Sequence, residues 1–329
     1  IIVSSGIEMM KNTIWPGLKS IQETAGINSS NITSGELAYR MAPRLNAPGR
    51  MGDSQSGLET LTTRSLSKAR EMAEHLDSMN RQRQAIEGEI IDQIEESIIP
   101  HIELKTRRVL VIHDEGWHKG VLGIVASRLL NKYHRPVVVL TIQDGTATGS
   151  GRSIDGFDLY KALRKLEHLL VKYGGHYHAA GLTIKEDNLA AFSEGLEDLA
   201  KEELDTGDLI PSVEVDAEVS LEEITVDSVQ QMGSIAPFGA RNPEPVFYAR
   251  HLEVLSSRIV GERHLKLKVG QGDRAIEAIG FNLAKRYPLD GETIDLLFTP
   301  EIDSWNGHEK LQLRIVDLEL TDKVQIKTN

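Results

Sequence analysis

The chain has 329 residues, of which 26% are charged and 40% are apolar, and this length favours two or three domains of ordinary globular protein. It has no cysteine, which excludes disulfides, thiolate metal sites and cysteine nucleophiles, so we expect a reducing, cytoplasmic location. No apolar run approaches the roughly 20 residues that span a bilayer, and the first ten residues lack a secretory signal pattern, so we expect no membrane association.

The net charge of −12 argues at first against an anionic partner. However, residues 185–227 contain fifteen acidic residues and two lysines, so the rest of the chain is almost neutral. We interpret this stretch as a solvated acidic helix face, and basic surfaces elsewhere are compatible with the composition. The chain begins with Ile1 rather than methionine, and we expect it to be part of a longer protein.

The first hundred residues divide into two parts. Residues 1–60 are expected to be rich in loops with short helices. Residues 64–100 predict one long helix, because apolar residues recur there at steps of three and four, and Pro100 would end it. A helix of about 35 residues is about 50 Å long, so we expect it to bridge two domains.

Residues 105–204 predict an α/β domain, because strand and helix patterns alternate. The predicted strands are apolar runs at 107–113, 136–142 and 179–184, and the predicted helices cover 120–133, 157–166 and 187–203. After residue 205 the period becomes two, which predicts an all-β module small enough to need barrel closure. Its expected strands are 213–221, 246–260, 264–270, 275–281, 293–303 and 310–320.

The segment APRLNAPGR, residues 42–50, carries two arginines around an asparagine, Arg44, Asn46 and Arg50. Its two prolines argue against a regular helix. Guanidinium groups suit phosphate oxygens, so these three residues are candidate anion ligands. The alternative is a loop in which the arginines cap a carboxylate.

Residues 114–129 describe the end of a strand, a short loop with His118, and a helix led by glycine. The first N–H groups of a helix can bind an anion, and His118 could donate to the same group. The alternative is a turn histidine whose hydrogen bonds are satisfied locally.

Residues 148–157, TGSGRSIDGF, predict a short glycine loop that carries Ser150 and Arg152. Such a loop can gather its N–H groups into an anion nest. If the segment is extended, the two side chains point to the same side. The alternative is a glycine-rich hairpin end with a surface arginine.

Residues 173–181, YGGHYHAAG, place small residues around two histidines. No cysteine or carboxylate nearby completes a metal site with His176 and His178, and residues 113–118 offer too few ligands for a two-metal centre. We therefore expect no metal here. Either the segment is a tight turn beside a core, or a phosphate or nucleotide packs closely against its glycines, Gly174, Gly175 and Gly181.

Together these segments resemble one family. GGHYHAAG is similar to the G-G-H-x-x-A-A-G signature of the DHHA1 domain, which follows the DHH domain in the DHH phosphoesterase superfamily. The order of APRLNAPGRMG, WHKGVLGIVASRL, GSGRSIDGFDL and PFGARNPEPVF resembles that of the RecJ family of single-strand-specific 5′→3′ exonucleases of bacteria. The resemblance covers about residues 35–320 and depends on the ordered combination of motifs.

The resemblance implies a fold and a domain order. The fold class is an α/β DHHA1-type domain plus an all-β OB-fold barrel, preceded by a long bridging helix. We expect residues 1–60 to be the remnant of a catalytic DHH domain, 61–104 the connecting helix, 105–204 the DHHA1 domain and 205–329 the OB-fold. In the family, the DHH domain holds two Mn²⁺ or Mg²⁺ ions, so this chain alone is expected to bind none and to be inactive.

The resemblance also implies roles for single residues. Arg44 would contact DNA phosphate, Ser150 and Arg152 would clamp the 5′-phosphate, and His176 would face the catalytic cleft. Trp305 is a candidate for base stacking, with a hairpin tip as the alternative. We expect the three loops around Arg44, Arg152 and His176 to converge on one anion-receiving groove, with the side chains of Arg152 and His176 on the same face of their domain.

The implied function is 5′→3′ digestion of single-stranded DNA in repair and recombination. The implied partners are single-stranded DNA and either a single-strand-binding protein or a helicase, and we expect a monomer. Two alternatives stay open: a non-catalytic scaffold of replication related to this family, and an oligonucleotide or cyclic-dinucleotide phosphodiesterase. Ser150, Arg152 and His176 argue against the first, and the added barrel argues against the second.

Overall fold

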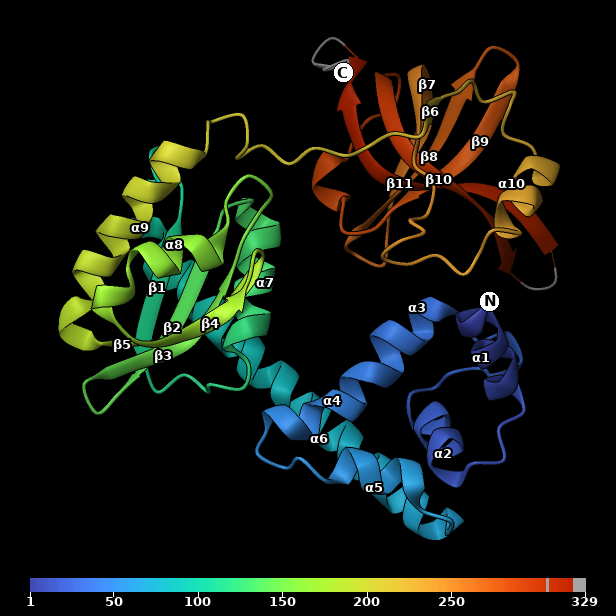
Figure 1. Cartoon of the computed structure of the whole chain (residues 1–329). Helices are drawn as coiled ribbons and strands as arrows, with labels where there is room; N and C mark the ends of the chain where they lie inside the picture. The colour runs from blue at the N-terminus through green and yellow to red at the C-terminus, as the bar shows by residue number, and fades with distance from the viewer. Residues whose placement is uncertain (306–307, 322–329) are drawn as a thin grey trace. The chain divides into compact units, whose positions relative to one another are not determined.

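The structure is a computed structural model that describes residues 1–305 and 308–321, without the side chains of residues 31, 304, 305, 308 and 309. The chain divides into two compact units: the larger one is Gly6–Ser212, and the smaller one contains the residues from Val213 onward together with Ile1–Ser5. Figure 1 shows the elements that build each unit. The larger unit contains a group of helices, a long helix and an α/β domain, and the smaller unit contains a β-barrel.

Short helices form most of the first part of the chain, so the expected helices are confirmed, but the segment is not rich in loops as predicted. These helices are α1 (Ile2–Lys11), α2 (Pro16–Thr24), α3 (Ser34–Glu36), a π-helical turn (Leu37–Met41), α4 (Ala42–Arg50) and α5 (Ser56–Thr62). The expectation that the prolines prevent a helix at 42–50 is wrong. Pro43 is the second residue of α4, directly after the π-helical turn Leu37–Met41, and Pro48 lies two residues before the helix ends.

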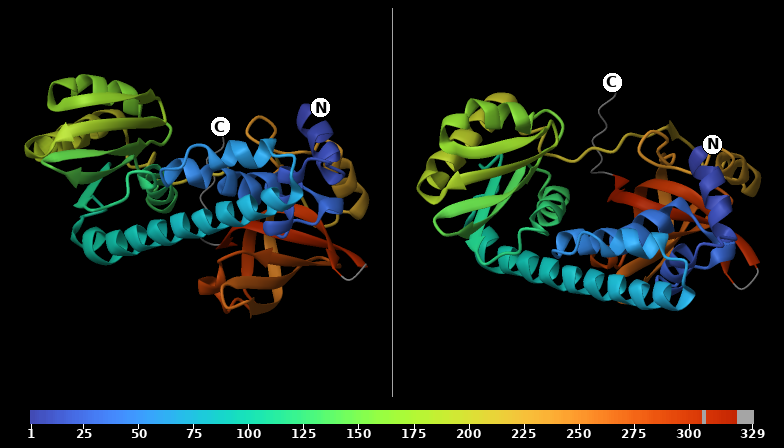
Figure 2. Two further views of the ribbon diagram at one scale, coloured as in Figure 1. Left: turned by 90° about the horizontal axis from the view of Figure 1, so that it is seen from below. Right: turned by 60° about the horizontal axis from the view of Figure 1, so that its bottom comes forward.

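The long helix predicted at 64–100 is α6, Leu66–Gln93, and helical turns continue through Ile94–Ile98 and Ile99–His101. Figure 2 shows α6 as one continuous rod. Its buried face is apolar at both ends: Leu76 belongs to the core of the N-terminal helices, and Ile90 belongs to a core shared with the α/β domain. The apolar spacing predicted the helix itself, and α6 contributes to two hydrophobic cores.

Between these ends the buried face of α6 is polar. Arg83 donates from Nη1 to Glu87 Oε2 at 2.5 Å and from Nη2 to Asn80 Oδ1 at 2.7 Å. Arg128 forms an ion pair with the other oxygen of the fully buried Glu87 at 2.5 Å. Because Arg128 belongs to α7 (Leu122–Tyr133), these charges fix the rotation of α6 against the α/β domain.

The α/β domain is a five-stranded sheet in the order β1-β2-β3-β5-β4. Its strands are β1 (Leu110–Glu115), β2 (Val137–Gln143), β3 (Thr146–Arg152), β4 (Leu170–His176) and β5 (Ala179–Lys185). β1 and β2 are parallel, and the other pairs are antiparallel. α7 packs on one face, while α8 (Leu159–Lys165) and α9 (Leu189–Glu203) share the core on the other face.

The sequence placed Ser150 and Arg152 in a loop, and this prediction is wrong, because both lie in β3. The glycines interrupt the alternation of apolar and polar residues that indicates a strand. They are nevertheless required, because β3 packs closely against its neighbours. A Cβ at Gly149 would lie 1.9 Å from the Val139 carbonyl oxygen, and a Cβ at Gly151 would lie 2.7 Å from Leu159 Cδ2. Without those side chains β3 fits between β2 and β5 and pairs with both along its length.

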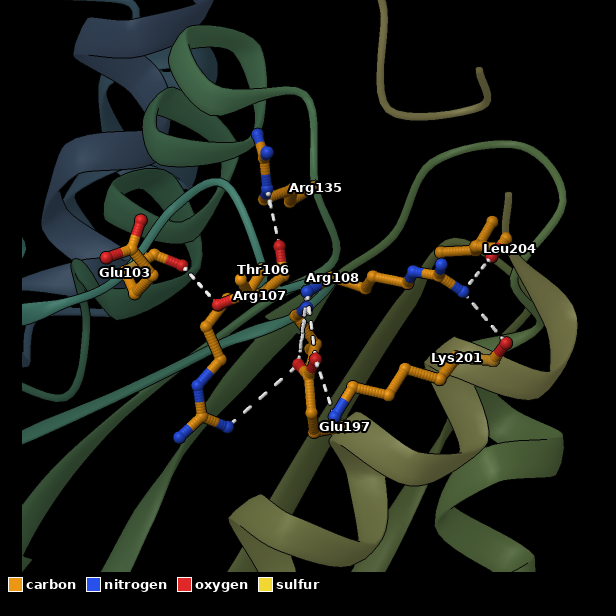
Figure 3. A network of polar contacts seen from close by, with 9 residues as sticks. Glu103, Thr106, Arg107, Arg108, Arg135, Glu197, Lys201 and Leu204 are labelled. Atoms are coloured by element: carbon orange, nitrogen blue, oxygen red, sulfur yellow. Dashed lines mark hydrogen bonds and ion pairs between the residues drawn. The ribbon is translucent and has the colours of Figure 1, made fainter. Parts of the chain in front are cut away.

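A buried carboxylate fastens the start of β1 to α9 (Figure 3). Glu197 is 3% exposed and accepts hydrogen bonds from the backbone N–H groups of Arg108 and Val109 at about 3.1 Å. Lys201 lies 3.6 Å from its other oxygen. The guanidinium of Arg108 donates in turn to the Lys201 and Leu204 carbonyls, so it caps the end of α9.

The smaller unit is a closed barrel, as predicted. Its strands are β6 (Ala217–Glu218), β7 (Phe247–Val260), β8 (His264–Gln271), β9 (Arg274–Gly280), β10 (Thr293–Trp305) and β11 (His308–Leu320), and its helix is α10 (Val226–Gly233). The order is β10-β11-β9-β8-β7-β6, and pairing of β10 with β7 closes five of the strands. The strand expected at 213–221 is only the two residues of β6.

Candidate functional site

The strand register places Arg152 and His176 on the same face of the α/β sheet. Arg152 in β3 pairs with Ala179 in β5, and Ala179 pairs with His176 in β4. Residues that lie directly opposite in antiparallel strands point to the same side. The cation and the imidazole therefore share one row, separated by Ala179, on the face that carries α7.

The neighbouring row contains a hydroxyl and two bare backbone positions. Ser150 pairs with Gly181, which pairs with Gly174. Both glycines are exposed, and a Cβ placed on Gly174 would meet no atom within 4 Å. Since nothing inside the protein requires glycine at Gly174, the open space above it is free for a ligand. Gly175 points to the other face, where a Cβ would overlap Ala180.

The Arg152 guanidinium lies at the beginning of α7. It is partly buried, and a Cβ on Gly123 would lie 2.9 Å from its Nη2 and 3.5 Å from Ser150 Oγ. Its Nη1 donates to the Gly151 carbonyl at 2.8 Å. Among the described side chains no carboxylate pairs with it. Burial, and secondly the positive charge of Arg50, lowers the pKa of Arg152.

The loop before α7 leads into the helix start beside the Arg152 guanidinium and contributes His118 and Gly120 to the candidate site. His118 Nδ1 accepts the Gly120 N–H at 3.1 Å, which leaves Nε2 as the donor of a neutral imidazole. Val121, the N-cap residue of α7, gives no side-chain hydrogen bond, so the N–H groups of the first turn have no side-chain acceptor and can bind an anion. The end of α4 packs here, because Arg50 Nη1 donates to the Gly120 carbonyl at 3.3 Å.

The structure brings Arg50, rather than Arg44, next to Arg152. Arg44 Nε donates to Asp77 of α6 at 2.8 Å, and its Nη1 donates to the Arg40 carbonyl. Since 42–50 is helical, residues six apart point in different directions. The alternative in which an arginine of this segment caps a carboxylate therefore describes Arg44. Asn46 is exposed on the same helix.

The barrel carries a separate basic surface that the sequence motifs did not indicate. A groove of about 340 Å³ is lined by Lys268, Arg274, Glu277 and Lys310 with apolar neighbours. Lys310 and Lys266 donate to the carboxylate of Glu277 and lower its pKa to about 2. Alternating lysines in 264–268 were the available sequence signal. The predicted stacking residue Trp305 has its side chain outside the described part of the chain.

The described residues do not offer a metal site of their own. No three histidine, aspartate or glutamate side chains within the described ranges come together as metal ligands. In the same part of the chain, no helix combines the length and apolar character that would let it cross a bilayer.

Comparison with known proteins identifies both domains. The model of the DHHA1 domain matches residues 106–202, and the model of the RecJ OB domain matches residues 215–317. The chain is 35% identical over 314 residues to the single-stranded-DNA-specific exonuclease RecJ of Escherichia coli, and it is 30% identical over 328 residues to the RecJ of Bacillus subtilis. These matches cover 91% and 98% of this chain but 54% and 42% of the relatives.

A solved structure agrees with the sequence matches. Crystal structures of Thermus thermophilus RecJ with Mg²⁺ and with Mn²⁺ have TM-scores of 0.82 and 0.83, at 27% identity, and each match covers at least 96% of this chain. This chain covers less than half of either crystallised chain, 48% and 46%. The chain thus belongs to the RecJ family and corresponds to the C-terminal part of its members.

Proposed function

We propose that this chain is the C-terminal part of a single-stranded-DNA-specific 5′→3′ exonuclease and that it holds the 5′-phosphate of the strand. One observation carries the proposal: the partly buried Arg152 has no acidic partner among the described residues, and it lies with Ser150 at the uncapped start of α7. A guanidinium, a hydroxyl and helix N–H groups are the donors that bind a terminal phosphate dianion.

The row of His176 and the row of Gly174 suggest how the terminal nucleotide lies. With its phosphate at Arg152, the nucleoside would cover the bare backbone of Gly174 and Gly181. His176, on the same face, would orient the phosphodiester group to be cut. Holding the 5′ end in this way would set the polarity of digestion. Arg50, His118 and Asn46 would add contacts around the phosphate, and Arg44 would act through Asp77 by positioning α4.

The remaining parts of the proposal follow the family. Residues 1–60 would belong to the catalytic domain, and 205–329 would grip the strand through the basic groove of the barrel. We assign the metal ions, Mn²⁺ or Mg²⁺ in the longer relatives, to the part of the protein outside these 329 residues, so the chain alone would not cut DNA. The physiological setting would be repair and recombination, with a monomeric protein and a single-strand-binding protein or helicase as partner.

Two other functions have less support. A non-catalytic scaffold needs no phosphate clamp. In a scaffold, the partly buried and unpaired charge of Arg152 would lower the stability of the fold without any function that explains it. A phosphodiesterase of short oligonucleotides needs no second binding domain, which leaves the barrel without a role.

A titration of the purified chain tests the clamp. We expect a 5′-phosphorylated single strand of about 20 nucleotides to bind roughly 10-fold more tightly than the 5′-hydroxyl strand, as a charge-assisted contact of about 1.5 kcal/mol requires. Fluorescence anisotropy at fixed salt would measure both affinities, with blunt duplex DNA as the control. Equal affinity for the two single strands would favour the scaffold, and rapid digestion in Mn²⁺ would contradict the assignment of the metals.

A further inference from the structure

On β3, β5 and β4, the sheet face that carries Arg152 has no acidic residue. On β3, β5 and β4 the positions that point away from the α8 and α9 core are Thr146, Thr148, Ser150, Arg152, Ala179, Gly181, Thr183, Lys185, Lys172, Gly174 and His176. None is a carboxylate, although the chain has 49 acidic residues. The face therefore has a positive charge that extends beyond the row of Arg152.

The row on the other side of the glycines is polar and cationic. Lys172 pairs with Thr183, and Thr183 pairs with Thr148. The two threonine hydroxyl oxygens lie 3.2 Å apart. One hydroxyl donates to the other, so the second hydroxyl proton is left for an outside acceptor. Lys172 is exposed and has no ion pair among the described side chains.

The spacing of the rows matches the repeat of a polyanion. Positions two apart along a strand are separated by about 7 Å, so the Lys172 row lies about 7 Å from Ser150's row and about 14 Å from the Arg152 row. A ligand with one phosphate at Ser150 and Arg152 can therefore place another near Lys172. Lys185 lies one position beyond Thr183 on the same face, which extends the positive charge in the same direction.

We propose that Lys172, with the Thr148–Thr183 hydroxyl pair, forms a second phosphate subsite on this sheet face. The inference rests on the proposed function for its first subsite, at Arg152. Lys172, an exposed lysine without an ion pair among the described side chains, favours a charged group over the neutral edge of a base. The second phosphate has two sources: a further phosphodiester of the bound strand, or the outer phosphates of a strand with a 5′-triphosphate end.

The test uses the full chain and the variants Lys172→Gln and Lys172→Arg. The matched control is Lys161→Gln on α8, because Lys161 is an exposed lysine of the same domain on the opposite side of the sheet. Each protein is titrated with single strands that bear a 5′-hydroxyl, a 5′-monophosphate or a 5′-triphosphate, at several salt concentrations. Arg152→Gln is included in every series.

If the second phosphate belongs to the strand, Lys172→Gln is expected to weaken all three ligands about 5-fold and to reduce the salt slope by about 0.7. If it belongs to a 5′-polyphosphate, only the triphosphate strand loses affinity. In both cases Lys172→Arg keeps the affinity. Identical affinities and slopes for Lys172→Gln and Lys161→Gln with every ligand would overturn the subsite. If Lys172→Gln lowered the affinity and Arg152→Gln did not, the second subsite would be supported. The proposed 5′-phosphate clamp at Arg152 would then be refuted.

Discussion

Replacing Arg152 by glutamine is expected to abolish the preference of the chain for a 5′-phosphorylated strand. The affinity for that strand should fall about 10-fold, to that of the 5′-hydroxyl strand, because the variant loses a charge-assisted fork that contributes about 1.5 kcal/mol. The affinity for a 5′-hydroxyl strand should change little, since that end presents no dianion to Arg152. The difference between the two ligands, measured by anisotropy, isolates the contact with the terminal phosphate.

Two further variants make this result specific. Arg164→Gln removes an exposed arginine from α8, on the other side of the sheet, and should leave both affinities unchanged. Arg152→Lys keeps the charge but loses the planar fork, so an intermediate affinity is expected. If Arg152→Gln and Arg164→Gln lowered both affinities equally, the effect would be nonspecific charge, and Arg152 would have no particular role.

The largest effect on stability is expected from Glu197→Ala. This substitution leaves the buried N–H groups of Arg108 and Val109 without an acceptor and removes the ion pair with Lys201. We expect the free energy of unfolding of the α/β domain to fall by about 2–4 kcal/mol. Hydrogen exchange of β1 and β2 peptides in increasing urea would measure it without interference from the barrel.

The control for this prediction is Glu202→Ala, five residues further along α9. Glu202 is exposed, so its removal should change the free energy by no more than about 0.5 kcal/mol. If Glu197→Ala and Glu202→Ala had the same free energy of unfolding, the contacts of Glu197 in Figure 3 would not stabilise the packing of β1 against α9. A loss confined to β8 and β9 would likewise contradict the assignment.

The sequence predicted those helices and strands whose hydrophobic periodicity matches the way they are buried in the fold. α6 follows an apolar spacing that two separate cores need, and β2 is an apolar run because both of its faces are buried. The sequence did not predict β3, because its glycines are required by close contacts with residues outside the strand. A Cβ at Gly149 would overlap the Val139 carbonyl, and a Cβ at Gly151 would overlap the side chain of Leu159. Strand propensity alone disfavours glycine, and only the tertiary fit explains it.

The geometry expected for the candidate residues agrees with the structure in part. Ser150 and Arg152 were expected on one side of an extended segment, and their register in β3 agrees. The convergence of Arg44 with Arg152 was not met, because the helix of α4 directs Arg44 to Asp77 and ends with Arg50 beside Gly120. The proposed contribution of Lys172 depends on the pairing of β4 with β5, which no motif in the chain indicates.

The most direct measurement is a crystal structure of the chain with a short 5′-phosphorylated deoxyribonucleotide strand. The terminal phosphate is expected at the start of α7, within hydrogen-bonding distance of Arg152 and Ser150, with its nucleoside over Gly174. A strand bound with its 5′ end on the opposite face of the sheet, or bound to the barrel alone, would show that Arg152 and His176 do not form a substrate site.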